Sequence, residues 1–159
     1  MSHAYNVAVR WTGDRGTGTS GLRDYDRTHV VEADGPPPLV GSSDPAFRGE
    51  ADRWNPEQLL VAALSQCHML WYLHLCATAG VVVTAYSDDA GGTMEEEPDG
   101  AGQFTEVVLR PQVKISDQAM AHAAKTLHAE AHAKCFIARS VNFAVRHEPT
   151  LSVAEGVAR

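Results

Sequence analysis

The sequence predicts an α+β fold in which two long helices are set among clustered β-strands. The first helix is expected from an apolar segment of roughly two dozen residues, 55–79. A second, alanine-rich segment at 116–134 has the composition of a helix. Short runs rich in β-branched residues precede the first helix, separate the two helices and follow the second. Strands therefore cluster around the helices instead of alternating with them, which favours α+β over α/β.

Composition narrows the class of protein. At 159 residues and 17.1 kDa, the chain is expected to form a single domain, 1–159. A net charge of −7 argues against nucleic acid and anionic membrane surfaces as partners. Three cysteines are an odd number, which argues against a secreted disulfide framework. Residues 1–5 lack the basic and apolar regions of an export signal. Polar side chains interrupt the apolar run 59–79, so we expect a cytoplasmic protein that does not span a membrane.

The N-terminal third is expected to contain two strands and a long loop. Residues 6–11 and 26–32 have the composition of strands. The sequence Gly-Pro-Pro-Pro at 35–38 ends regular structure. Residues 41–53 are rich in serine, aspartate and glycine, and a polar loop of this length is a candidate wall for a functional site.

Several signals agree on where the first helix begins and ends. Asn55 is a preferred N-cap, Pro56 suits the first helical position, and Gln58 can complete a capping box. Gly80 supplies the stop. The helix would be about 36 Å long at 1.5 Å per residue. Because it is apolar around most of its circumference, it must be enclosed by protein. A sheet wrapped around it, aided by a partner subunit, would achieve this.

The remaining strands are expected after this helix. Residues 81–86 and 140–146 have strand patterns, and 104–115 alternates as a strand in which Pro111 indicates an edge or a bend. The acidic, glycine-rich stretch 87–102 is expected to be a hairpin tip or a loose loop.

The second helix is expected to begin at Ser116 as its N-cap and to run to about Lys134. Asp117 in the first turn suits the positive end of the helix dipole. Cys135 follows the last turn directly, where a thiol would be exposed.

Cys67 lies in the middle of the apolar helix, and two interpretations compete for it. Only a thiolate is a good nucleophile, and apolar surroundings disfavour the charged form. A reactive Cys67 therefore needs a cation from another segment, because His68 points about 100° away around the helix. The competing interpretation is a small buried hydrophobe, which we also expect for Cys76 on the opposite side of the helix. The available cations are Arg48 and Arg53 in the polar loop, and Arg15, Arg23 and Arg27 upstream.

The motif Asn-Pro-Glu-Gln-Leu-Leu at 55–60, with Cys67 ten residues after its glutamate, resembles the OsmC/Ohr family (osmotically inducible protein C and organic hydroperoxide resistance protein). Cys135, between a helix and a strand, resembles the second cysteine of that family. Residues 41–49 resemble its OsmC-like subgroup. The resemblance covers about residues 5–148. It implies an intertwined homodimer in which antiparallel sheets wrap around two long central helices, and thiol-dependent reduction of hydroperoxides without a cofactor or metal.

The resemblance also implies residue roles. Cys67 matches the peroxidatic cysteine, which becomes a sulfenic acid, and Cys135 matches the resolving cysteine, which then forms a disulfide with it. Glu57 matches the glutamate that holds an activating arginine. Ten residues of helix span roughly 15 Å, so Glu57 would act on Cys67 across a dimer interface or through a folded-back loop. The arginine expected for the OsmC-like branch is Arg48, and the alternatives nearer the N-terminus are Arg15 and Arg23.

Two departures from the family pattern concern the substrate. Cys135 is followed by Phe-Ile where members often have proline, and His68 stands where phenylalanine is common after the first cysteine. Apolar neighbours would suit an organic hydroperoxide better than hydrogen peroxide. Regeneration by a dithiol, of lipoyl type by the resemblance, is expected. The residues expected to line the site are Leu64, Met69, Trp71 and Phe136.

Two other functions fit the sequence. A relative of this fold could lack efficient peroxidase chemistry and bind a small apolar ligand or sense redox state. A metal-binding module could use His128, His132 and Cys135, with His122 nearby. Surface histidines on an alanine-rich helix are the simpler explanation of this group.

Overall fold

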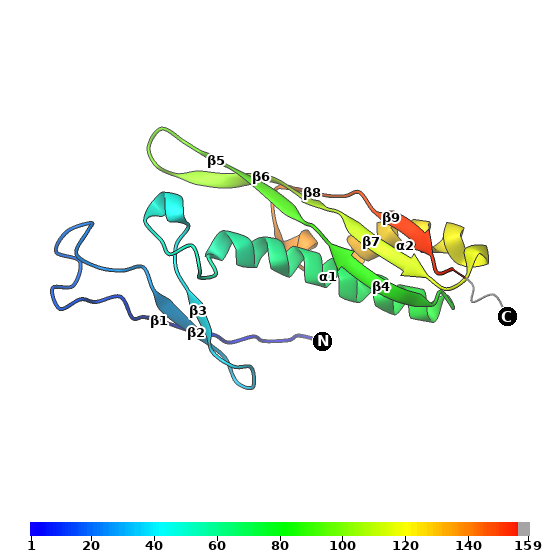
Figure 1. Ribbon diagram of the computed structural model, residues 1–159, viewed down its shortest axis with the longest axis horizontal. Helices are drawn as coiled ribbons and strands as arrows, with labels where there is room; N and C mark the ends of the chain where they lie inside the picture. Colours follow the sequence, from blue (N-terminus) through cyan, green and yellow to red (C-terminus); the bar gives the residue numbers. More distant parts are fainter. Residues whose placement is uncertain (156–159) are drawn as a thin grey trace. The chain divides into compact units, whose positions relative to one another are not determined.

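The computed structural model describes residues 1–155, and its chain forms two compact units, Met1–Leu60 and the part from Val61 onward. Figure 1 shows the order of the elements along the chain. The structure is of the mixed α+β type that the sequence predicts.

The first unit is built on a small antiparallel sheet. Its strands are β1 (Ala8–Trp11), β2 (His29–Glu32) and β3 (Leu39–Gly41), with β2 in the centre. The first two strands were predicted, and β3 was not. The predicted polar loop contains a short 3₁₀-helix, η1 (Pro45–Phe47).

Helix α1 (Pro56–Thr78) begins and ends where the sequence predicts. The Asn55 side chain accepts a hydrogen bond from the Gln58 amide at 2.8 Å, and the Gln58 side chain accepts from the Asn55 amide at 3.2 Å. This is a reciprocal capping box. The chain leaves the helix through Gly80, whose φ of +76° lies in the left-handed region that glycine enters at little cost.

From Val61 onward, α1 has one buried face and one exposed face. The buried side chains recur every three to four residues, as one helical stripe. Leu70, on the other side, is 59% exposed. Among residues 1–155, α1 is long and apolar enough to cross a membrane, but core helices of soluble proteins meet the same criterion. The buried stripe is Leu64, His68, Tyr72, Leu75 and Cys76, and the exposed stripe is Gln66, Leu70, His74 and Ala77.

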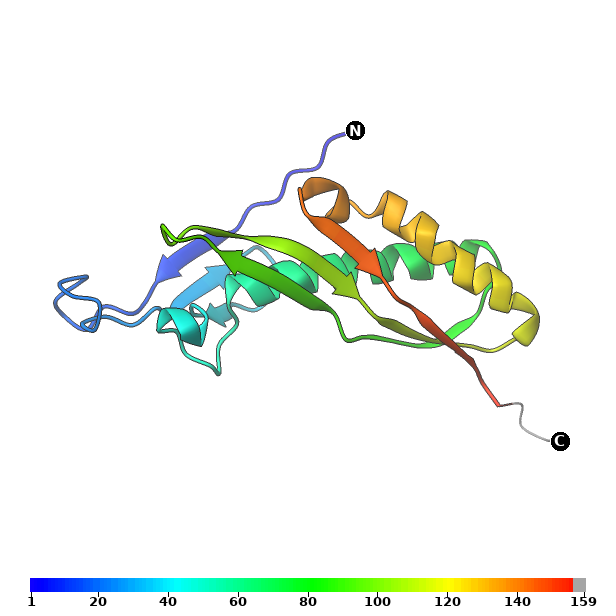
Figure 2. The ribbon, with the colours of Figure 1, turned by 90° about the horizontal axis from the view of Figure 1, so that it is seen from above.

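Two three-stranded sheets form the second unit, and α1 and α2 (Ala121–Lys134) lie side by side against them (Figures 1 and 2). In each sheet, the two strands that precede α2 in the chain pair antiparallel, as predicted. The strand that follows α2 pairs in parallel with the middle strand of the sheet. A helix between two strands allows this parallel return. The first sheet has the order β4 (Val83–Asp88), β7 (Pro111–Ile115), β9 (Thr150–Val153), and the second β5 (Gly91–Glu96), β6 (Gly102–Leu109), β8 (Ala144–His147).

Three sequence predictions can be compared with this unit. Of the two alternatives expected for residues 87–102, the structure shows the hairpin, because β5 within them pairs with β6. The segment 104–115 is two strands broken at Arg110, which agrees with the bend expected at Pro111. The helix after β7 is capped by Asp117, not Ser116. The Asp117 carboxylate accepts from the Ala119 amide at 2.9 Å and starts a 3₁₀ turn, η2 (Gln118–Met120), ahead of α2.

Two apolar clusters hold the helices against the sheets. In the larger cluster, Tyr72 of α1 packs with Ile115 of β7 and Ala124 of α2, and its hydroxyl donates to the Ala124 carbonyl at 3.0 Å. In the smaller cluster, Leu64 of α1 packs with β6 residues Val107 and Leu109. The larger cluster therefore joins α1 to α2 and β7, and the smaller cluster joins α1 to β6.

Candidate thiol site

The structure brings Cys67 and Cys135 together. Cys67 lies in the middle of α1, and Cys135 is the C-cap of α2, where the backbone turns to an extended conformation. Both thiols are free, and Cys67 lies near enough to raise the pKa of Cys135. Two neighbouring thiols on adjacent helices can form a disulfide.

The surroundings of Cys135 make it a poor first nucleophile. It is 1% exposed, which corrects the expectation of an exposed thiol at a helix end. Burial, and after it the neighbouring Cys67 thiol, raises the Cys135 pKa to about 11. The amide of Ala138, at the start of η3 (Ala138–Ser140), donates to the Cys135 sulfur at 3.4 Å. That amide favours the thiolate but does not overcome burial.

The two thiols therefore differ in access. Cys67 is half-buried, at the edge of the buried stripe of α1, whereas Cys135 lies beneath the surface. A solvent-borne oxidant would reach Cys67 first. The buried thiol of Cys135 is therefore placed to react with the oxidised form of Cys67 and not with a reagent in solvent.

Cys76 takes no part in this pair. It is 1% exposed, as the sequence interpretation of a buried hydrophobe predicts, and belongs to the larger apolar cluster. Burial raises its pKa, and its partner is the hydroxyl of Tyr72. A buried thiol with a raised pKa is chemically inert.

An aromatic pair flanks the two thiols in sequence. Trp71 follows Cys67 by one helical turn and Phe136 follows Cys135 directly. Their rings meet edge to face, 5.5 Å apart at an angle of 80°. Phe136 is 66% exposed and can meet an apolar ligand. Leu64, also expected to line the site, is instead fully buried against β6.

Glu57 and the candidate arginines belong to the first unit. One carboxylate oxygen of Glu57 is buried and has no hydrogen-bond partner within residues 1–155. Arg48 is exposed and follows η1 with a φ of +67°, and Arg15 pairs with Asp26 at 3.6 Å. Over the same residues, none of the predicted arginines pairs with Glu57. In the described part of the second unit, no lysine or arginine is hydrogen-bonded to either sulfur.

A cluster of histidines lies between α1, α2 and the end of β8, and sequence reasoning missed it. His68 and His128 are 1% and 3% exposed, and His147 and His132 are half-buried. The Nε2 of His68 and the Nδ1 of His128 are 3.0 Å apart. The expectation of surface histidines is therefore wrong for His128, because α2 turns that side toward α1. It holds for His122, which is exposed.

Burial disfavours the charged form of three of these histidines, His68, His128 and His147. It lowers the pKa of His68 to about 4, with a further contribution from His147 and His132. Burial, then the neighbouring His68, lowers the pKa of His128 to about 3. The pKa of His147 is also lowered, first by burial. Within residues 1–155, no three histidine, cysteine or acidic side chains converge on a point that could hold a metal ion, so the geometry gives the metal-module interpretation no support.

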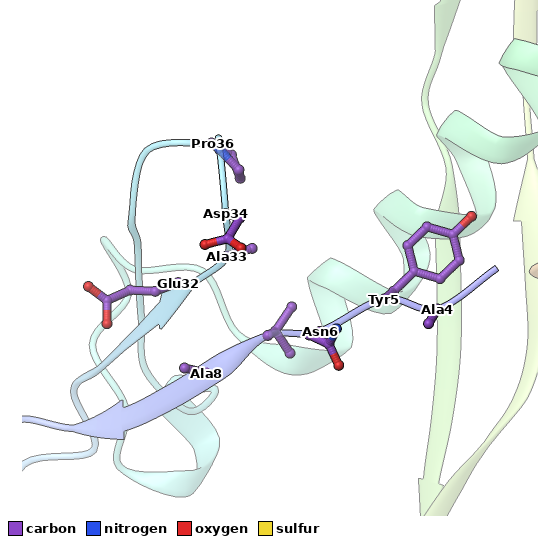
Figure 3. A pocket seen from close by; sticks show the side chains of 9 residues that line it. Ala4, Tyr5, Asn6, Ala8, Glu32, Ala33, Asp34 and Pro36 are labelled. Carbon is purple, nitrogen blue, oxygen red and sulfur yellow. The ribbon is translucent and has the colours of Figure 1, made fainter.

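The first unit carries a cavity of about 760 Å³ between residues 4–8 and the turn at residues 32–36 (Figure 3). Its ionisable side chains are Tyr5, Glu32 and Asp34, which point to no nucleophile or metal site. We assign it no role in the chemistry of the thiols.

The chain is similar in sequence and in fold to known proteins. A family model for OsmC-like proteins matches residues 49–150. An OsmC-like protein of unknown function from Vibrio cholerae is 32% identical and superposes with a TM-score of 0.84, over 94% of this chain and 100% of that one. Among curated proteins, none matches this sequence.

More distant structures share the fold. An organic hydroperoxide resistance protein from Elizabethkingia anophelis, 19% identical, superposes with a TM-score of 0.67 over 97% of this chain and all of its own. The organic hydroperoxide resistance protein OhrB of Bacillus subtilis, 18% identical, gives a TM-score of 0.60 over 94% of this chain and 98% of its own.

Proposed function

Because this chain belongs to the family of OsmC-like proteins, we propose that it is a cofactor-free thiol peroxidase that reduces organic hydroperoxides. One observation carries the proposal: a half-buried thiol, Cys67, lies beside a fully buried one, Cys135. Two structures of the same fold come from organic hydroperoxide resistance proteins, which supports the substrate class.

The two thiols divide the reaction into steps. The Cys67 thiolate attacks the distal oxygen of the hydroperoxide, the O–O bond breaks, and the alkoxide leaves as the alcohol after taking a proton. Cys67 is now a sulfenic acid. Cys135 attacks its sulfur, a Cys67–Cys135 disulfide forms and water leaves. An external dithiol, of lipoyl type, reduces the disulfide and is itself oxidised to a disulfide.

Activation of Cys67 requires a positive charge. We assign this role to Arg48, with Arg15 and Arg23 as alternatives, held by Glu57. The unpartnered buried oxygen of Glu57 supports this assignment, because a buried carboxylate oxygen without a donor is costly and a guanidinium would satisfy it. The arginine would come from the same chain or from the partner in a homodimer. We place the enzyme in the cytoplasm, free of membrane and nucleic acid.

The aromatic pair favours an organic substrate. Trp71 and Phe136 offer ring surface beside the two cysteines, and an alkyl or aryl group gains from covering it. Hydrogen peroxide has no such group. Comparable rate constants for hydrogen peroxide and cumene hydroperoxide would contradict this preference.

A coupled assay tests the proposal. The purified chain is given cumene hydroperoxide with dihydrolipoamide, and alcohol formation is followed together with the mass of the cysteine peptides. We expect multiple turnovers and a Cys67–Cys135 disulfide when the reductant is omitted. If the disulfide forms with a general oxidant but peroxide is not turned over, the chain is the alternative, a redox sensor or ligand-binding relative of the peroxidases.

A further inference from the structure

We infer that His68 and His128 are positioning residues that hold Cys135 against Cys67, and that proton uptake by this histidine pair releases Cys135 from its buried place. The inference deepens the proposed function and rests on it for the role of the two thiols. The contact itself can be measured without any peroxide.

The geometry of the histidine pair shows a single directed hydrogen bond. The ring centroids are 5.3 Å apart, the ring planes differ by 4°, and the two facing nitrogens are 3.0 Å apart. These values place the rings end to end in one plane, which is the best alignment for an N–H···N bond. The bond requires one proton between the two nitrogens. A second proton there removes the acceptor and breaks the bond.

Among residues 1–155, the contacts of this pair include no carboxylate that could compensate an added charge. The second ring nitrogen of His68, Nδ1, is buried and has no partner within residues 1–155. The ring of Tyr72 stacks on His128 at 3.9 Å and 11°. A cavity of about 230 Å³ reaches His128 and gives protons a route from solvent. The titratable or charged groups around the pair are Cys67 and Tyr72 from α1, Lys125 and His132 from α2, and His147 from β8.

The histidine pair and the thiol pair join the same two helices. His68 follows Cys67 on α1, and Cys135 follows the helix that carries His128 and is bonded through its amide to the His132 carbonyl at 3.3 Å. Loss of the histidine bond removes a polar contact between α1 and the C-terminal half of α2. Movement of this half away from α1 would carry Cys135 with it and separate the sulfurs.

The size of the effect follows from proton linkage. In an open form the two imidazoles would have ordinary pKa values near 6.5, whereas the closed form keeps both neutral to about 4 and 3. Each imidazole therefore favours opening up to tenfold per pH unit below 6.5. For the pair, the population of the open form should rise roughly 100-fold between pH 7.5 and 5.5.

The experiment measures how often Cys135 becomes accessible. In a Cys67→Ser/Cys76→Ser background, Cys135 is the single thiol, and its reaction with 4,4′-dithiodipyridine is timed from pH 7.5 to 5.5. Each rate is divided by that of an unstructured cysteine peptide at the same pH, which removes the intrinsic pH dependence of thiol reactivity. We expect this ratio to rise roughly 100-fold toward pH 5.5. A ratio that stays flat overturns the inference.

Matched variants identify the groups responsible. His68→Gln/His128→Asn places amide groups near the positions of the bonded nitrogens and keeps a hydrogen bond that cannot titrate. We expect its ratio to rise less than tenfold, and an unchanged 100-fold rise overturns the inference. If circular dichroism shows that this double variant does not fold, His128→Asn alone is measured. His122→Gln, an exposed histidine of the same helix, should keep the full rise.

These outcomes are separable from those of the peroxidase proposal. The probe contains no peroxide, so a chain that fails to turn over cumene hydroperoxide can still show the pH-dependent release of Cys135. A chain that turns over peroxide but shows a flat reactivity ratio keeps the proposed function and loses this inference.

Discussion

At the scale of single residues, the two cysteines differ in exposure. This difference predicts that substituting each cysteine stops the peroxidase reaction at a different step. Cys67→Ser should abolish turnover with the fold retained, because no other thiol can attack the peroxide. Cys135→Ser should still consume one equivalent of cumene hydroperoxide and stop at the Cys67 sulfenic acid. Trapping with dimedone and intact-mass measurement distinguish the two variants. Repeated turnover by Cys135→Ser with dihydrolipoamide would show that the second thiol is dispensable.

Cys76→Ser is the matched control for these substitutions. Cys76 is as buried as Cys135, but its partner is the Tyr72 hydroxyl. A serine hydroxyl can keep that contact, so we expect turnover close to that of the parent and a loss of about 1 kcal/mol in unfolding free energy. If Cys76→Ser abolished turnover while the chain stayed folded, the assignment of roles to the cysteines would be wrong.

Single residues also show how far the sequence alone could lead. Cys67 and Cys135 were paired by family resemblance, and the structure places the two thiols near each other. The burial of Cys135 and His128 could not be predicted, because it depends on which side of α2 faces α1. His68 did carry a signal, since it shares the four-residue spacing of Leu64 and Tyr72, two residues of the buried stripe.

At the scale of elements, the capping box of α1 offers a quantitative test. Asn55→Ala removes the acceptor of the Gln58 amide and leaves that donor without a partner, so we expect a loss of about 1 kcal/mol in unfolding free energy. Urea denaturation at fixed protein concentration measures it. Gln58→Glu is the control, because a carboxylate can accept from the Asn55 amide as the glutamine does. Equal losses in both variants would argue against the reciprocal box.

The sequence predicted α1, whose ends are set by neighbouring residues. It did not predict β5 and β9, which form by pairing with other strands. The bounds of α1 follow from Asn55 and Gly80, which act through their own backbone neighbours. Strand β5 is polar and rich in glycine, and β9 is four residues long, so neither has a strand pattern of its own. Strand β5 forms because it pairs with β6, and β9 forms because it pairs with β7. Such strands depend on contacts distant in sequence, which propensity does not report.

At the scale of the whole molecule, the buried histidines make stability depend on acid. His68 and His128 stay neutral in the folded chain to about pH 4 and 3, but accept protons near pH 6.5 when unfolded. Their contribution is therefore complete above pH 6.5 and is lost as pH falls toward 4. Two such groups give a slope of roughly 2 to 3 kcal/mol per pH unit over that range.

Urea titrations from pH 7.5 to 4.5 measure this slope, and His68→Gln/His128→Asn should flatten it. His147, whose pKa is also lowered, would leave a residual slope in that variant. An unfolding free energy that is constant from pH 7 to 5 in the parent would mean that the pair is already charged in the folded chain, or is solvated more fully than its 1% and 3% exposure indicates.

The exposed stripe of α1 predicts a homodimer. A helix whose composition is apolar nearly all round has one face buried within the second unit and leaves Leu70 59% exposed. A second copy covering this face would remove that surface from water, and its arginines would become further candidates for the activation of Cys67. We expect a dimer at micromolar concentration in sedimentation velocity, and we expect Leu70→Glu to weaken it at least tenfold, because the charge would have to be buried.

Val82, also 59% exposed but outside the helix, provides the matched control: Val82→Glu should dimerise as the parent does. A monomeric parent would exclude catalysis across an interface and would leave Arg48, Arg15 and Arg23 of the same chain as the candidate activators of Cys67.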